Sequence, residues 1–267
     1  MADPDAGRVP VTQPSPIPPG PDDLEPVAAG EPVAGVGGSD LSVTGTPAGA
    51  RRALWVAAGL VLLVGVPLGL AVRLGWTPLL DLDRAVSDAL VVTGRGADVD
   101  VLRVLTAAGL VVARVVVLLP LVVWLAVLRR WQLVGFLVVA GIGISPVNRL
   151  LKDAFDRRRP SYEGTIDVGG LSFPSGHSSG GAALAALLVV LAWPVLVGVW
   201  RRVWVGIAIV GVVVVGFTRI ALGAHYLSDV VAGFGFGVAW VLVLAVLLGV
   251  WPGQIGALPG PGPTVRT

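Results

Sequence analysis

The chain has 267 residues, of which 55% are hydrophobic and 13% are charged, and its mean hydropathy is +0.85. A soluble domain of this length carries about 25% charged residues, so the composition indicates a chain solvated largely by lipid. The small net charge of +2, without a basic tail or stripe, argues against a nucleic-acid partner, and the absence of cysteine excludes disulfides, thiolate zinc sites and a cysteine nucleophile.

The first fifty residues differ from the rest of the chain. Residues 1–50 are rich in Pro, Gly, Ala and Asp and carry seven acidic residues against the single Arg8. Such a segment cannot bury enough apolar surface to offset its ordering entropy, so it is predicted to be a disordered tail. It lacks the basic start and short apolar run of a signal peptide. Residues 253–267 are predicted to form a second disordered tail, which leaves 51–252 as the membrane domain.

The membrane domain is predicted to be an all-α bundle of six transmembrane helices. A helix needs about 20 mostly apolar residues to cross the hydrocarbon core, and the apolar stretches lack the strict alternation of barrel strands. An even number of spans places both termini on one side of the membrane. The six predicted spans are residues 53–72, 106–128, 132–151, 178–199, 203–222 and 230–250.

The segments that connect the spans predict on which side of the membrane the two termini lie. Arginine pairs at 51–52, 129–130 and 201–202 fall at the first, third and fifth boundaries, which the topology places on one face. Arginine pairs beside short loops indicate the cytoplasmic side, so both termini are expected to be cytoplasmic. The opposite face also holds cations, but these are explained by a site described below. We therefore expect a multi-pass protein of the plasma (inner) membrane with an extracytoplasmic site.

Other polar or small residues in or near the spans have structural interpretations. Arg114 is expected to extend from the second span to the outer interface. Arg157–Arg158 are interpreted as lipid-headgroup anchors, and Asp81–Asp83 as part of an amphipathic outer segment. Gly233 and Gly237 form a GxxxG pair, which indicates close helix packing inside the bundle.

Three scarce residues gather on the predicted outer face. Lys152 is the only lysine among 19 basic residues, and His177 and His225 are the only histidines. Lys152 ends the third span, His177 begins the fourth, and His225 lies between the fifth and sixth. A single interfacial residue of this kind is usually structural, but the three together indicate a site.

The neighbours of Lys152 and His177 are suited to an anion. Arg159, followed by a proline, comes seven residues after Lys152. Lysine supplies a compact charge, whereas arginine offers a planar fork that matches two phosphate oxygens. Ser175 can cap the helix that starts at His177, and Gly176 permits a close approach of the backbone. The exposed N–H groups of that helix would then form an anion cradle.

The neighbours of His225 are suited to nucleophilic chemistry. Arg219 precedes it by six residues, and Asp229 follows it by four. Residues four apart share a face of a helix. A carboxylate in that position can hold one imidazole nitrogen protonated and leave the other free to attack.

Taken together, the three segments resemble the signature of the type 2 phosphatidic acid phosphatase superfamily, which also includes the vanadium haloperoxidases. That signature reads Lys-x6-Arg-Pro, then Pro-Ser-Gly-His, then Ser-Arg-x5-His-x3-Asp. The chain matches it from Lys152 to Asp229 with one departure, since Thr218 stands where serine is usual. The hydroxyl is retained, so we expect little functional consequence.

The resemblance implies a role for each matching residue. His225 would attack phosphorus and form a phosphohistidine, Asp229 would orient it, and His177 would protonate the leaving group. Water would then attack the intermediate, with no metal and no cofactor. The residues that would hold the phosphate oxygens are Lys152, Arg159, Ser175, the Gly176 backbone and Arg219.

The expected function is therefore a lipid phosphatase, with a lipid phosphate as substrate. In a bacterium the resemblance favours a polyprenyl diphosphate, phosphatidylglycerol phosphate or phosphatidic acid. The same residues would serve a lipid phosphotransferase. A non-catalytic membrane protein that binds or transports anionic lipids would need the cations but not the His225–Asp229 pair. A haloperoxidase fits poorly, because those relatives are soluble.

Overall fold

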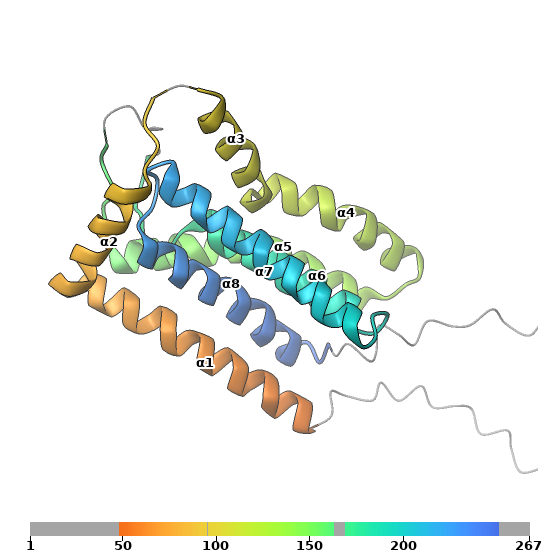
Figure 1. Cartoon of the computed structure of the whole chain (residues 1–267). Helices are drawn as coiled ribbons and strands as arrows, with labels where there is room; N and C mark the ends of the chain where they lie inside the picture. Colours follow the sequence, from red (N-terminus) through yellow and green to blue (C-terminus); the bar gives the residue numbers. More distant parts are fainter. Residues whose placement is uncertain (1–47, 95, 163–168, 251–267) are drawn as a thin grey trace, which may run out of the picture. The chain divides into compact units, whose positions relative to one another are not determined.

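The computed structural model describes residues 48–94, 96–162 and 169–250. The predicted tails 1–50 and 253–267 lie outside these ranges, except that residues 48–50 belong to the first helix. In the described residues the regular structure is helical (Figure 1), as the sequence predicts. The elements are α1 (Ala48–Arg73), α2 (Thr77–Leu90), α3 (Ala97–Thr106), the short 3-10 helix η1 (Ala107–Gly109), α4 (Val111–Val127), α5 (Trp131–Phe155), α6 (Gly176–Ala192), α7 (Val199–Ala221) and α8 (Leu227–Leu247).

Four of the described helices are long and apolar enough to cross a membrane, namely α1, α5, α7 and α8. A fifth candidate is the pair α3–η1 and α4, whose axes bend by 48°. The fourth predicted span, 178–199, is shorter than expected, because α6 has 17 residues and ends at Ala192 rather than at 199. The chain is therefore an all-α membrane protein with four to five candidate spans by length and composition.

The bend before α4 places η1 against the start of α6. Leu110 is extended, with φ −71° and ψ 153°, so the helix stops at Gly109 and restarts at Val111. Gly109 packs against the backbone of His177 so closely that a Cβ atom there would lie 2.6 Å from the His177 carbonyl oxygen. The absence of a side chain at Gly109 thus allows η1 to pack against His177, the second residue of α6.

Arg114 fixes the same bend from inside the protein. Its side chain is 2% exposed, so the prediction that it extends to the outer interface is wrong. It donates from Nε to the Gly141 carbonyl at 2.8 Å, from Nη1 to the Gly109 carbonyl at 3.1 Å, and from Nη2 to Ser145 Oγ at 2.8 Å. These bonds satisfy a buried guanidinium that would otherwise be costly, and they join η1, α4 and α5.

Helix α8 is packed against both α6 and α1 (Figure 1). A Cβ atom at Gly233 would lie 2.8 Å from the Ser175 carbonyl oxygen, and one at Gly237 would overlap the Ser179 backbone. The predicted close packing at this glycine pair is confirmed, because two small residues let the α6 and α8 backbones approach. The fully buried apolar cluster nearby contains Phe136, Leu137, Ala140, Ile144, Ala183, Leu187 and Val241.

The ends of the helices meet at two places. At one end, the Ser175 amide donates to the Asp229 carbonyl at 3.0 Å, which joins the starts of α6 and α8. Near the same end, the Val92 amide donates to the Ala221 carbonyl at 2.8 Å, which joins the residues after α2 to the end of α7. At the other end, the Gln132 side-chain amide donates to the Leu248 carbonyl. The segments that carry the predicted site therefore lie together at the first end.

The packing of α8 on α6 predicts that Gly237→Val destabilises the protein. The new side chain would overlap the Ser179 backbone, and overpacking of this kind costs about 1–3 kcal/mol. Gly59→Val on α1 is the matched control, because nothing lies within 4 Å of a Cβ atom there. Thermal unfolding in detergent should show a lower Tm for Gly237→Val than for Gly59→Val. Equal Tm values would contradict the described packing.

Candidate active site

His225 lies in the turn between α7 and α8 and is 2% exposed. The turn folds back onto α7, because the Arg219 carbonyl accepts from the Ala224 amide at 3.0 Å and from the His225 amide at 3.2 Å. Gly223 has a φ of +64°, a conformation that glycine adopts at no steric cost. The end of α7 therefore holds the imidazole at a fixed place inside the protein.

The two nitrogens of the His225 ring have different partners. Arg159 Nη1 lies 2.9 Å from Nε2, and a guanidinium can only donate hydrogen bonds. We therefore assign Nε2 as the unprotonated acceptor and Nδ1 as the protonated nitrogen. Nδ1 faces Ser172 Oγ at 3.4 Å and Asp229 Oδ2 at 3.5 Å. This arrangement leaves the lone pair of Nε2 on the side of the ring where the cation lies.

Asp229 is fully buried in the first turn of α8. Its Oδ2 atom accepts from the Tyr226 amide at 2.9 Å and from Ser172 Oγ at 2.5 Å. Its Oδ1 atom accepts from Arg157 Nη1 at 2.7 Å. The helix N-terminus and the guanidinium thus compensate the negative charge of the carboxylate. Because the Ser172 hydroxyl donates its hydrogen to Asp229, the Oγ atom of Ser172 is free to accept a hydrogen bond from His225 Nδ1.

Three basic side chains, those of Lys152, Arg159 and Arg219, lie around His225 and Asp229. Lys152 Nζ donates to the carbonyls of Leu171 at 2.5 Å and Ser172 at 3.1 Å. Arg159 also donates from Nη1 to the Ala224 carbonyl at 2.7 Å, beside its contact with the imidazole. Arg219 donates from Nη1 to Thr106 Oγ1 at 3.3 Å, and its buried Nε has no hydrogen-bond partner among the described residues.

Lys152 is within electrostatic reach of Arg159, Arg219 and Asp229. The buried Arg219 Nε hydrogen has no acceptor among the described residues, and the charge of Arg219 acts on His225. The structure thus brings together the basic residues that the sequence motifs single out, and their side chains offer N–H donors to an anion.

The start of α6 forms another part of this region. Ser175 is the N-cap, as predicted, and its Oγ accepts from the Ser178 amide at 3.4 Å and from Ser178 Oγ at 2.9 Å. Gly176 and His177, the first two residues of α6, are half-buried. His177 is within electrostatic reach of Arg219 and Arg159. The first N–H groups of α6 and the His177 ring therefore belong to the same cationic region.

Burial is the main influence on the pKa of His225. Desolvation is the largest cause and lowers this pKa, the charges of Arg159 and Arg219 act in the same direction, and the hydrogen bond and charge of Asp229 oppose them; the resulting pKa is about 3. The imidazole is therefore neutral at physiological pH. A neutral ring with its proton on Nδ1 has a lone pair on Nε2, as a nucleophile requires.

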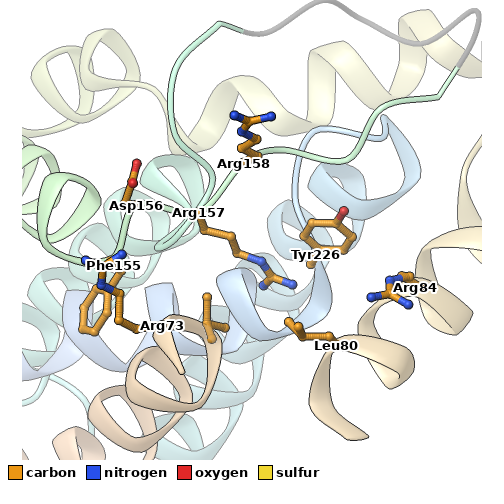
Figure 2. Close-up of a pocket in the computed structure, with 9 residues that line it drawn as sticks. Arg73, Leu80, Arg84, Phe155, Asp156, Arg157, Arg158 and Tyr226 are labelled. Carbon is orange, nitrogen blue, oxygen red and sulfur yellow. The ribbon is translucent and has the colours of Figure 1, made fainter. Parts of the chain in front are cut away.

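Two residues of the site were missed by sequence reasoning. Arg157 is 8% exposed and pairs with two buried carboxylates, so its interpretation as a headgroup anchor is wrong. Figure 2 shows Arg157 reaching toward Tyr226 while its neighbour Arg158, which is exposed, points the other way. Ser172 is also fully buried. No sequence motif marks Ser172. Exposure changes from residue to residue along 157–159, where Arg157 is buried, Arg158 is exposed and Arg159 is half-buried.

Comparison with known proteins agrees with this geometry. The sequence profile of the PAP2 superfamily matches residues 129–251, which include all three motifs. Residues 129–251 are a region of the PAP2 superfamily. The crystal structure of a transmembrane PAP2 type phosphatidylglycerolphosphate phosphatase from Bacillus subtilis is similar, with a TM-score of 0.58 and 27% sequence identity over 70% of this chain and 93% of that one.

Two curated proteins are also similar in sequence to part of this chain. Phosphatidylglycerophosphatase B from Bacillus subtilis (strain 168) is 34% identical over 113 residues, which are 41% of this chain and 54% of that protein. A lipid A 1-phosphatase from Rhizobium johnstonii is 35% identical over 109 residues, which are 37% of this chain and 41% of that protein. The chain thus matches about half the length, or less, of these relatives.

The environment of His225 predicts that its imidazole does not titrate near neutrality. His177→Gln leaves His225 as the only histidine of the chain, so its ring nitrogens can be followed by ¹⁵N NMR in detergent micelles. Because its lowered pKa keeps it neutral above about pH 3, two separate ring resonances should persist unchanged from about pH 5 to 8. Resonances that merge and move with a midpoint near 6.5, the unperturbed value, would contradict this environment.

Proposed function

We propose that this protein is a membrane lipid phosphatase in which His225 is the nucleophile. The observation that carries the proposal is the asymmetric environment of the His225 ring. Its Nε2 atom has a lone pair beside Arg159, and its Nδ1 atom faces the buried Asp229 and Ser172. A binding protein for anionic lipids needs cations, but it does not need a neutral imidazole whose tautomer is fixed by a carboxylate.

The first half of the reaction transfers the phosphoryl group to the protein. His225 Nε2 attacks phosphorus and the bond between phosphorus and the leaving oxygen breaks. His177 donates a proton to that oxygen, so that an alcohol, or a phosphate in the case of a diphosphate, departs. The imidazolium character that develops on His225 is stabilised by Asp229, which lies 3.5 Å from Nδ1.

The second half returns the protein to its starting state. His177, now neutral, takes a proton from a water molecule as that water attacks the phosphorus atom of the phosphohistidine. The phosphorus–nitrogen bond breaks, and inorganic phosphate leaves. In this scheme the charge on the phosphoryl oxygens is neutralised by Lys152, Arg159 and Arg219, together with the N–H groups at the Ser175–Gly176 start of α6.

Arg159 has two positions in this proposal. In the substrate-free protein its Nη1 atom donates to His225 Nε2 at 2.9 Å, which occupies the lone pair. When a phosphate enters, a phosphate oxygen replaces the imidazole as the acceptor for this guanidinium, because a charged oxygen is the stronger acceptor. The lone pair of Nε2 is then free, and the phosphorus atom lies next to it.

The substrate is proposed to be a lipid phosphate or diphosphate. Two of the similar proteins are named for phosphatidylglycerolphosphate and one for the 1-phosphate of lipid A. A site at the ends of membrane helices suits a substrate whose chains stay in the bilayer while the headgroup reaches the cations. Phosphatidylglycerol phosphate, phosphatidic acid and a polyprenyl diphosphate are the candidates to compare.

The topology that accompanies this function has six spans. We propose that α6 and the bent pair α3–η1–α4 cross the membrane together with α1, α5, α7 and α8. Both termini would then be cytoplasmic, next to the arginine pairs at 51–52, 129–130 and 201–202. The site would face the extracytoplasmic side of the plasma (inner) membrane.

The decisive variant is His225→Ala in the purified protein. Phosphate release from phosphatidylglycerol phosphate should fall to background, while binding of the same lipid persists, because the cations are still present. Arg103→Ala is the control, since Arg103 is half exposed on α3 and its ion-pair partner among the described residues is Asp100, three residues earlier on the same helix. Full activity in the His225→Ala variant would overturn the proposed mechanism.

The same assay separates the competing functions. Release of free phosphate without any added acceptor favours hydrolysis, whereas turnover that requires an alcohol acceptor indicates a phosphotransferase. Activity in the presence of EDTA agrees with a metal-independent reaction, and a loss that magnesium restores would contradict it. The ratio of kcat/KM among the three candidate lipids then identifies the preferred substrate class.

A further inference from the structure

A buried carboxylate outside the sequence motifs is connected to the proposed nucleophile. Asp83 of α2 is 0% exposed, although its neighbours on the same helix, Asp81 and Arg84, are mostly exposed and pair with each other. A buried carboxylate is costly unless donors compensate it. The sequence-based interpretation of this segment as merely amphipathic therefore does not account for Asp83.

The donors to Asp83 come from α8 and from the loop after α5. The Ser228 amide donates to Oδ1 at 2.9 Å, and Ser228 Oγ donates to Oδ2 at 2.5 Å. Arg157 Nη2 donates to Oδ2 at 2.7 Å. Ser228 is the second residue of α8, so its amide has no partner within the helix. Asp83 thus acts as an N-cap for α8 that is supplied by a different helix.

Arg157 joins the two buried carboxylates. Its Nη1 atom donates to Asp229 Oδ1 at 2.7 Å, while Nη2 binds Asp83. The Tyr226 ring lies 4.0 Å from the guanidinium carbon and covers it (Figure 2). Without this cation, two fully buried carboxylates would face each other across Ser228 with no opposite charge between them.

This arrangement sets the direction of the Asp229 carboxylate. Arg157 binds Oδ1, so Oδ2 is the oxygen that remains for Ser172 and the His225 ring. A rotation of the carboxylate would break the bonds to Arg157 and to the Tyr226 amide at once. The contacts of Arg157 and Asp83 thus fix which oxygen faces Nδ1, and with it the tautomer of the imidazole.

We infer that Asp83 and Arg157 are positioning residues for the nucleophile, and that helix α2 takes part in the reaction through them. The inference rests on the proposed function, since it assigns these residues to the His225–Asp229 pair. Arg157 therefore has a different role from the basic residues that are proposed to contact the phosphate, which are Lys152, Arg159 and Arg219. Loss of a phosphate contact weakens substrate binding, whereas loss of a positioning residue lowers kcat and leaves KM nearly unchanged.

The test compares two carboxylates of the same helix. Asp83→Asn should lower kcat on the order of 10-fold, and Arg157→Met on the order of 100-fold, with KM within about 2-fold of the parent value. Arg157→Lys should recover part of the loss, because it restores the charge but not the fork. Asp81→Asn, which removes only an exposed pair with Arg84, should leave kcat and KM unchanged.

Three further measurements exclude a role in stability alone. In an Asp229→Asn background, adding Asp83→Asn should not lower kcat again, because Asp83 acts through Asp229. In the His177→Gln background, Asp83→Asn should bring the two ¹⁵N resonances of His225 closer together, since the tautomer is no longer fixed. If Asp83→Asn does not fold, Ser228→Ala replaces it: this variant removes the bond from Ser228 Oγ to Asp83 Oδ2, keeps the backbone cap, and should lower kcat in the same direction.

The outcomes distinguish this inference from the proposed function. If Asp83→Asn and Arg157→Met keep the parent kcat and the separate resonances, with only a lower Tm, the positioning role is overturned. An additive loss in the Asp229→Asn background also overturns it. If His225→Ala is active, the proposed function itself has failed, whatever the Asp83 variants do.

Discussion

The arrangement of the site depends on how the charge of Asp229 is compensated inside the protein. A fully buried carboxylate needs several donors, and Asp229 obtains them from the α8 N-terminus, from Ser172 and from Arg157. The Ser175 amide also binds the Asp229 carbonyl, which joins the start of α6 to the same turn. Consequently α6, α8 and the loop after α5 cannot shift independently of one another without leaving a buried charge unpaired.

The chemistry follows from the same compensation. With Nδ1 held toward a carboxylate, the unprotonated nitrogen of His225 is directed to the cations, and burial keeps the ring neutral by lowering its pKa to about 3. Cationic side chains and helix N–H groups can then neutralise phosphoryl oxygens. His177 lies instead in the electrostatic field of Arg219, Arg159 and Arg114. The two histidines therefore differ in environment, since His225 lies beside a buried carboxylate whereas His177 lies among cations.

The sequence predicted the all-helical fold and most of the residues that gather at the site, because they occur in local motifs or are scarce in the chain. Lys152, His177 and His225 belong to the second group, and the Ser175 cap and the Gly233–Gly237 contact depend on local spacing. Arg114, Arg157 and Asp83 were assigned to the surface, because a single sequence does not show the buried partners that other helices supply. The length of α6 was overestimated, since apolar residues continue beyond Ala192 where the helix ends.

The most direct test of the account is to trap the phosphorylated enzyme. Purified protein would be mixed with phosphatidylglycerol phosphate carrying ³²P in its terminal phosphate, quenched rapidly in alkali, and digested for mass spectrometry. The account predicts an acid-labile, alkali-stable label on the peptide that contains His225, attached at Nε2 of the imidazole and absent in His225→Gln. A label on His177, or phosphate release at full rate with no protein-bound label under single-turnover conditions, would contradict it.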